Sequence, residues 1–147
     1  MSPEELEAYI HEHIPLTAAM DLKVDRADSE EVRLRAPLLP NVNHQGTAFG
    51  GSIAALALAA GWISVRMKVG PLPQVVISEC TIKYRRPIVE DLVAVCAAPS
   101  ERVWERFVTK LEKRGAGRID LDVHLYCGDE PCVTMHGRYV AVLGKGA

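Results

Sequence analysis

The segment Asn43–Ser52 carries the residues whose types and spacing could do chemistry. It reads NHQGTAFGGS and leads into a long run without charged residues, which predicts a buried helix. The first N–H groups of a helix have no partner inside it, and with the helix dipole behind them they can stabilise negative charge on a carbonyl oxygen. Gly50, Gly51 and Ser52 would lie at this end, where glycine lets a carbonyl group approach closely. Alternatively, the two glycines only allow tight packing of the helix against a sheet.

A polar residue in the loop before this helix is a second candidate. Asn43 could orient a water molecule or the carbonyl group, or its side chain could cap a turn of the loop. The sequence favours neither role over the other.

Glu79 is the candidate for a general base. It stands in the middle of an otherwise apolar strand, where a charge must reach solvent or a cleft. Alternatively it is an ordinary residue of the polar strand face, because alternation would put it on one face with Ile77, Thr81 and Lys83. We predict that Glu79 acts as a general base.

No metal site and no redox site are expected. His124 and His136 could lie close together across a hairpin, but no spacing motif supplies a third ligand, so exposed strand histidines explain them. None of the four cysteines belongs to a CxxC pair. Cys127 and Cys132 flank a turn and could be bridged, but free thiols are the expectation for a reduced cytoplasmic protein.

The candidate residues must be positioned by a mixed α and β chain. A first helix is predicted from the cap Ser2 to the residue before Pro15, and a surface helix from the cap Ser100 to Gly115. Alternation and β-branched runs predict strand pairs at 22–27 with 32–36, 74–86 with 92–98, and 119–127 with 133–143. Val103, Phe107, Val108 and Leu111 should form the apolar face of the surface helix.

The last strand pair reads as a long hairpin around the turn residues GDEP. If Cys127 lies opposite Val133, then Asp122 lies opposite Arg138 and His124 lies opposite His136, a register that parity permits but does not fix.

The uncharged run Thr47–Val65 is long enough to span a bilayer. Its strongly apolar residues contribute insertion energies of about −2 to −4 kcal/mol in total, which its glycines, serines and threonine largely offset. We therefore expect no membrane span. Because the helix is apolar on nearly every face, and one small sheet cannot cover it, we predict a homodimer built around it.

Composition excludes other classes of protein. The length fits a single domain, residues 1–147, and 17 Lys and Arg against 19 Asp and Glu give a net charge of −2, without the basic excess of a nucleic-acid-binding protein. The opening segment is acidic and no signal peptide is apparent, which predicts a cytoplasmic protein.

The order and spacing of several short motifs resemble the hotdog-fold acyl-CoA thioesterases. Residues that match the phenylacetate-pathway branch are Asn43, Gly46, Thr47, Gly50 and Gly51, whereas Phe49 stands where that branch has histidine. Residues Tyr84–Pro87 resemble the aromatic-x-x-proline ending of the strand that follows the helix in this family, and residues 137–141 resemble the family's last strand. A closer likeness is the YiiD C-terminal family, through NxNxxGTxFxGSI, the Gly61-Trp62 pair and the paired cysteines, over about residues 5–143.

The resemblance implies an α+β hotdog fold, with an antiparallel β-sheet wrapped around a long central α-helix. It implies hydrolysis of an acyl thioester, at a site between subunits of a dimer or a dimer of dimers, with no metal or cofactor and with coenzyme A only as part of the substrate. Expected catalytic residues are Asn43, Gly51 and Glu79, and expected substrate contacts are Thr47, Phe49, Gly50, Ser52, Trp62 and Arg86. Arg85 and Arg86 could meet coenzyme A phosphates, or they are ordinary surface arginines.

One departure from the pattern keeps other functions open. The phenylacetate-type enzymes carry their carboxylate on the central helix, and that position is Leu58 here. A non-catalytic acyl-CoA-binding module is therefore an alternative, and a hydratase or dehydratase that uses His44 is another, although a solvated loop histidine is favoured.

Overall fold

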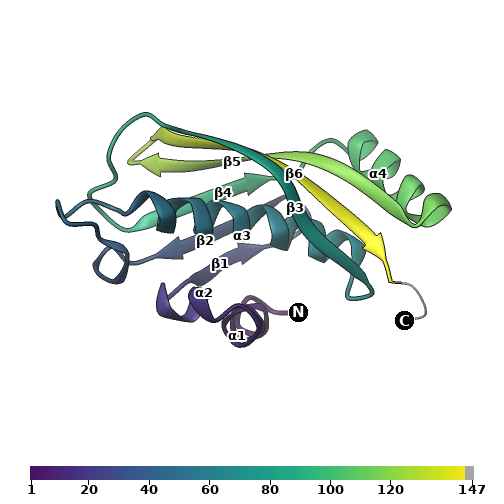
Figure 1. Ribbon diagram of the computed structural model, residues 1–147, viewed down its shortest axis with the longest axis horizontal. Coiled ribbons are helices and arrows are strands. Elements are labelled where there is room, and N and C mark those ends of the chain that lie inside the picture. Colours follow the sequence, from purple (N-terminus) through teal and green to yellow (C-terminus); the bar gives the residue numbers. More distant parts are fainter. Residues whose placement is uncertain (145–147) are drawn as a thin grey trace.

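Six antiparallel strands form one sheet in the computed structural model, which describes residues 1–144. Their order across the sheet is β1-β2-β4-β5-β6-β3 (Figure 1). The strands are β1 (Lys23–Ala27), β2 (Glu31–Ala36), β3 (Pro73–Tyr84), β4 (Leu92–Ala97), β5 (Ala116–Cys127) and β6 (Glu130–Leu143). The helices are α1 (Pro3–His13), α2 (Pro15–Ala19), the 3₁₀ turn η1 (Leu39–Asn41), α3 (Gly50–Val69) and α4 (Glu101–Arg114).

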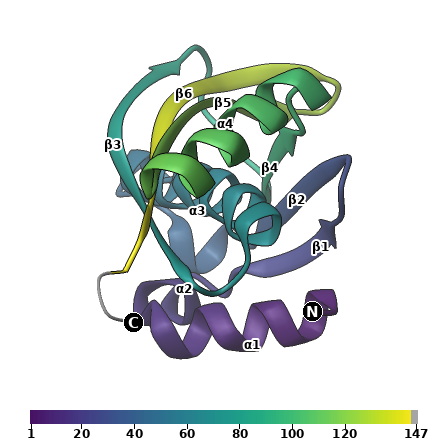
Figure 2. The same cartoon turned by 90° about the vertical axis from the view of Figure 1, so that its right-hand side faces the viewer.

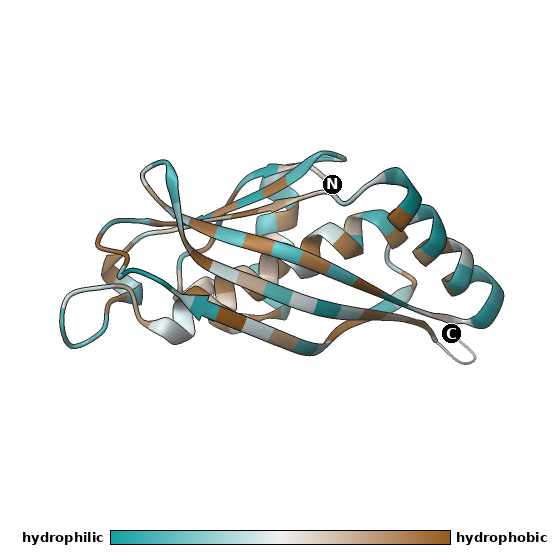
Figure 3. Cartoon of the chain, turned by 90° about the horizontal axis from the view of Figure 1, so that it is seen from above, coloured by the Kyte–Doolittle hydropathy of each residue, from teal (hydrophilic) through white to brown (hydrophobic). Residues whose placement is uncertain are grey.

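The sheet curves around α3, which confirms the expected wrapped helix (Figure 2). Leu56, Ala57, Ala60 and Ile63 of α3 are fully buried against the sheet. Along the long strands hydrophobic residues alternate with hydrophilic ones, so that one face of the sheet meets α3 and the other meets solvent (Figure 3). By length and composition α3 could also cross a membrane, but half of its most apolar stretch is buried inside the protein.

The N-terminal helices are set by capping chemistry and by proline. Ser2 and Glu5 form the reciprocal capping box that starts α1. The sequence predicted that α1 ends before Pro15, and it does, but Pro15 also begins the short helix α2, which was not predicted. Proline is favoured at the first position of a helix because its missing N–H has no intrahelical partner there.

The buried face of α4 differs from the prediction by one residue. Trp104, Phe107 and Leu111 are buried, whereas Val103 is exposed. These three lie at the helical spacing of three and four, and the larger indole contributes more apolar surface than valine, so Trp104 takes the place predicted for Val103.

The register of the β5–β6 hairpin also corrects the prediction. Cys127 lies opposite Glu130, not opposite Val133, because the turn contains only two residues, with Gly128 at a φ of 65°. An irregularity between Leu125 and Tyr126 then shifts the pairing by one residue. Asp122 therefore lies opposite His136, Arg138 lies opposite Asp120, and His124 lies opposite Thr134 and not opposite His136. A two-residue turn with positive φ fits the twist of the strands better than the longer GDEP turn that the sequence suggested.

Candidate functional site

The first turn of α3 presents backbone donors without partners. Phe49 is the N-cap residue, in an extended conformation, and no side chain caps the helix. Among residues 1–144, no protein acceptor takes a hydrogen bond from the backbone N–H of Gly50, Gly51 or Ser52. The structure thus has free backbone donors at the helix start that the glycine-rich segment predicted. An oxyanion role for Gly51 stays a prediction.

Three hydrogen bonds fix this helix end in the fold. The N–H of Phe49 donates to the carbonyl of Asn41 at 2.7 Å, and the N–H of Ala48 donates to the carbonyl of Ile88 at 2.8 Å. The hydroxyl of Tyr84, the last residue of β3, donates to the carbonyl of Gly50 at 2.8 Å. The donors are therefore held rigidly relative to the sheet.

The side chain of Asn43 organises the loop in front of α3. Its Oδ1 accepts from the N–H groups of Gln45, at 2.9 Å, and Thr47, at 3.1 Å, and its Nδ2 donates to Oγ1 of Thr47 at 2.8 Å. Asn43 therefore caps a turn of the loop, which is one of the two roles expected for it, and its side chain also binds the hydroxyl of Thr47. Both residues lie beside the helix end, and a catalytic part for Asn43 stays a prediction.

A bulge in β3 determines where Glu79 lies. The pairing of β3 with β6 shifts between Ile77 and Glu79, so Ile77 lies opposite the buried Tyr139 and Glu79 lies opposite Arg138. The expected common face of Ile77 and Glu79 is wrong for this reason: the extra residue, Ser78, moves Glu79 to the outer face of the sheet.

The carboxylate of Glu79 thus does not lie near the first turn of α3 in its own chain. It lies 3.6 Å from a guanidinium nitrogen of Arg138, and its side chain is 71% exposed. Arg138 also bonds Asp120, and this pairing lowers the pKa of the Asp120 carboxyl. Glu79 as the base stays a prediction.

Trp62 lies farther along α3, on the face that also holds Leu58. Its indole Nε1 donates to the carbonyl of Val75 at 2.9 Å, which fixes the ring against β3. Trp62, Leu58 and Ala55 line an apolar cleft of about 250 Å³ between α3, α2 and the sheet. Trp62 therefore lies away from the first turn of α3, but on the helix face that also includes that turn.

The remaining candidates do not join the site. Arg86 lies beyond Tyr84 and pairs with Glu130 at 3.3 Å on the surface. His44 is exposed in its loop. In residues 1–144 no three His, Cys, Asp or Glu side chains are grouped to hold a metal ion. The four cysteines are free thiols, with no disulfide between Cys127 and Cys132.

Tyr84 is the residue of the site that sequence reasoning did not single out. In the sequence it belongs only to the strand-ending motif Tyr84–Pro87. Nothing in the sequence shows that the end of β3 reaches the start of α3, because that contact depends on the curvature of the sheet around the helix.

Comparisons with known proteins identify the family and the fold of the chain. Residues 3–143 match a family described as "Putative thioesterase (yiiD_Cterm)". A Chlorobaculum tepidum protein of unknown function is 28% identical, with a TM-score of 0.89, over 97% of this chain and 94% of that one.

Two other solved structures carry thioesterase descriptions. A "putative thioesterase" from Shewanella oneidensis is 25% identical, with a TM-score of 0.84, over 95% of this chain and 96% of that one. A Haemophilus influenzae thioesterase is 12% identical, with a TM-score of 0.75, over 97% and 92% of the two chains, and it supports the fold alone. The fold is thus that of the hotdog thioesterases, as expected.

Proposed function

Because the chain belongs to the yiiD_Cterm family of thioesterases, we propose that it hydrolyses the thioester of an acyl group carried by coenzyme A or a related carrier. The observation that carries the proposal is the uncapped first turn of α3. The substrate carbonyl oxygen would lie against the N–H of Gly51, with Gly50 and Ser52 beside it. Phe49 and Thr47, which precede these residues, would contact the substrate around that carbonyl.

The proposed reaction needs no metal and no bound cofactor. Water attacks the carbonyl carbon, and the negative charge that develops on the oxygen is stabilised by the helix end. Collapse of the tetrahedral intermediate breaks the carbon–sulfur bond. The proton that the attacking water gives up reaches the leaving sulfur, so the products are the carboxylic acid and the free thiol. Fixed backbone donors favour this path because they are already oriented before charge develops.

The half-buried face of α3 offers a binding position for the acyl group. The apolar cleft beside Ala55, Leu58 and Trp62 lies on this face, and Trp62 is held by its bond to Val75. We propose that the acyl chain extends from the first turn toward Trp62. Arg86, two residues after Tyr84 in the sequence, would meet the phosphates of the carrier if it exchanges its surface partner Glu130 for them.

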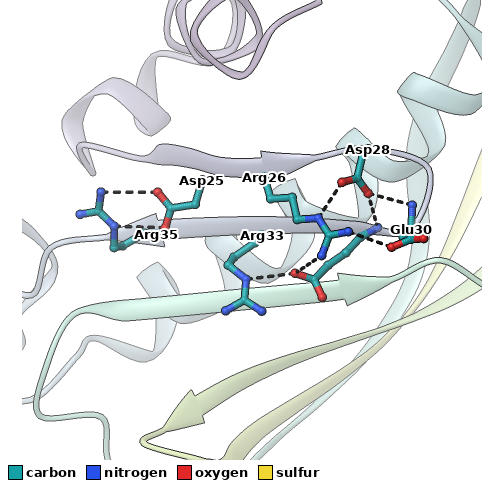
Figure 4. A network of polar contacts seen from close by, with 7 residues as sticks. Asp25, Arg26, Asp28, Glu30, Arg33 and Arg35 are labelled. Carbon is teal, nitrogen blue, oxygen red and sulfur yellow. Dashed lines mark hydrogen bonds and ion pairs between the residues drawn. The ribbon is translucent and has the colours of Figure 1, made fainter.

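The two edges of the sheet support a homodimer. At the β1 edge, charged side chains of β1, β2 and their connecting turn form two separate groups of ion pairs and hydrogen bonds (Figure 4). One joins Arg35 to Asp25 at 3.2 Å, and the other includes Arg26 with Asp28 at 2.6 Å. Such charges oppose pairing with another strand. The β3 edge is longer and exposes Val76, at 54%. We propose that β3 and the uncovered face of α3 meet a second copy.

A free-thiol assay tests the activity. The wild-type protein should release thiol from at least one class among short, medium, long and aromatic acyl-CoA substrates, without added metal or cofactor. A hydratase or dehydratase would change the acyl chain and release no thiol, which separates that alternative.

The second candidate function is a non-catalytic acyl-CoA-binding module. It is favoured by the composition of α3, which contains no carboxylate and has Leu58 where related enzymes carry their acid. A thermal-shift titration with a non-hydrolysable acyl-CoA analogue identifies it, because a ligand that binds only the native state raises the melting temperature. A shift together with no thiol release from any substrate would replace the hydrolase proposal with this one.

A further inference from the structure

We infer that Tyr84 is a positioning residue of the thioesterase site, which acts through the peptide group between Gly50 and Gly51. The inference rests on the proposed function. Tyr84 does not touch the substrate in this arrangement. Its hydroxyl donates to the carbonyl of Gly50, and the N–H of that same peptide group belongs to Gly51, the proposed donor to the substrate oxygen.

The contact between Tyr84 and Gly50 has two parts. The hydroxyl oxygen lies 2.8 Å from the Gly50 carbonyl oxygen. The ring lies beside the glycine, with ring atoms 3.6 and 3.7 Å from where a Cβ of Gly50 would stand. Ring packing and the hydrogen bond together prevent the Gly50–Gly51 peptide plane from tilting, so the N–H of Gly51 keeps one direction.

The hydrogen bond also affects the strength of the donor. A bond accepted by a peptide carbonyl polarises the whole peptide group and makes its N–H a better donor, since chains of hydrogen bonds strengthen one another. The Gly51 N–H has no protein partner among residues 1–144, so this gain is available to a ligand oxygen. The stabilisation that this stronger donor gives increases as the ligand oxygen becomes negative. The polarised N–H therefore lowers the free energy of the transition state more than that of the bound substrate.

Tyr84 keeps its proton while it does this. Partial burial raises the pKa of its hydroxyl above the ordinary value of 10.0. At neutral pH the group is thus a hydrogen-bond donor and not a phenolate, which would repel the Gly50 carbonyl.

Its strand position is fixed from the opposite side. Tyr84 pairs with Val133 at the end of the β3–β6 ladder, and the following residue, Arg85, donates its N–H to the carbonyl of Cys132 at 2.8 Å. The sheet, and not a loop, therefore positions the hydroxyl of Tyr84 against α3.

The test is Tyr84→Phe, which keeps the ring and removes the hydroxyl. With the acyl-CoA that the wild type hydrolyses best, kcat should fall by about threefold to tenfold, the range for one neutral hydrogen bond, while KM stays nearly unchanged. In ¹H–¹⁵N spectra, the Gly51 amide proton should move upfield, because its peptide group is less polarised.

Tyr139→Phe is the matched control. The hydroxyl of Tyr139 also donates to a carbonyl of α3, that of Leu58, at 2.8 Å. The peptide N–H on the far side of that carbonyl lies inside the helix and is not free to bind a ligand. Tyr139→Phe should lower the melting temperature at least as much as Tyr84→Phe, yet leave the Gly51 amide proton unchanged. The control is read by these two measurements and not by kcat, because Tyr139 lines the apolar cleft proposed for the acyl chain.

The outcomes separate the two proposals. An active wild type whose Tyr84→Phe variant keeps its kcat, or loses rate only in proportion to folded protein, overturns the role of Tyr84 and leaves the hydrolase intact. An unmoved Gly51 amide proton overturns it as well. A wild type without turnover on any acyl-CoA overturns the proposed function and the role of Tyr84 together.

Discussion

The ring of Phe49 lies against the Cα of Gly51 so closely that a Cβ on Gly51 would be 2.5 Å from Cε2 of the ring. The ring is 56% exposed, so it can turn toward solvent when something occupies its place. A side chain on residue 51 would clash with the ring of Phe49 in its present position. Glycine at this position therefore allows the aromatic ring to cover the helix end.

This relationship permits a clean test of the Gly51 N–H as an oxyanion donor. Gly51→Pro removes the N–H in the first helical turn, where it has no intrahelical partner, so the helix is retained. We expect turnover to fall by about 10²-fold, as for the loss of one oxyanion-hole donor. The measurement is kcat for thiol release, with circular dichroism to verify the fold.

Gly51→Ala is the control for that variant. It displaces the ring of Phe49 as Gly51→Pro does, but it keeps the N–H. Turnover of Gly51→Ala should exceed that of Gly51→Pro by at least about tenfold. Equal losses in the two variants would mean that Gly51 serves packing alone.

Replacement of Glu79 tests the predicted base. Glu79→Gln keeps the size of the side chain and removes its basicity, so a general base would lose about 10²–10⁴-fold in turnover. We expect this loss, with analogue binding retained. The carboxylate lies beside Arg138 on the outer face, and if it served only as a surface ion pair its loss would leave turnover nearly unchanged. A Glu79→Gln variant that keeps most of the thiol-releasing activity would mean that the base lies elsewhere.

Most of the fold could be predicted because its signals are local. The Ser2 cap and Pro3 fix the start of α1, and the alternation in β5 follows from its burial on one face. The central helix was predicted over Thr47–Val65 and is found at Gly50–Val69. It begins later because Ala48 pairs with Val42 in an isolated β-bridge, and it continues because basic side chains in its last turn favour the helix dipole.

The parts that were missed depend on contacts between distant segments. The bulge at Ser78 carries no glycine or proline that would mark it, and it turns Glu79 away from the face of Ile77. The partner of Tyr84 is likewise set by sheet curvature. The glycines of the helix end could be predicted because a helix start and its free donors are encoded within a few residues.

Burial of Cys96 predicts a loss of stability in alkali. Burial raises the pKa of this thiol from 9.0 to about 11, so between these values the unfolded chain loses the proton while the folded chain keeps it. The stabilising contribution is complete below pH 9 and is lost as pH rises toward 11, by up to about 1.4 kcal/mol per pH unit. The free energy of unfolding in urea, measured from pH 8 to 10.5, should fall less steeply in Cys96→Ala.

Cys80→Ala provides the comparison for that slope. Cys80→Ala removes an exposed thiol and leaves the buried Cys96 in place, so the slope that is due to Cys96 should persist in this variant. The slopes are compared rather than the absolute stabilities, because Cys96→Ala also leaves a small cavity. Identical slopes in the wild type and Cys96→Ala would contradict the prediction.

The homodimer is tested by a lysine on the β3 edge. Val76→Lys places a charge on the exposed strand, and lysine on an edge opposes pairing with a second strand. Light scattering at micromolar concentration should give twice the chain mass of 16.1 kDa for the wild type. The dissociation constant of the variant dimer should be at least about tenfold higher, which is about 1.4 kcal/mol.

Val103→Lys is the control for that variant. It makes the same substitution away from both edges, at a residue of α4 that is 39% exposed, and it should remain dimeric. A wild-type mass of 16.1 kDa, or equal dissociation of the two variants, would remove the β3 interface and the intersubunit site proposed with it.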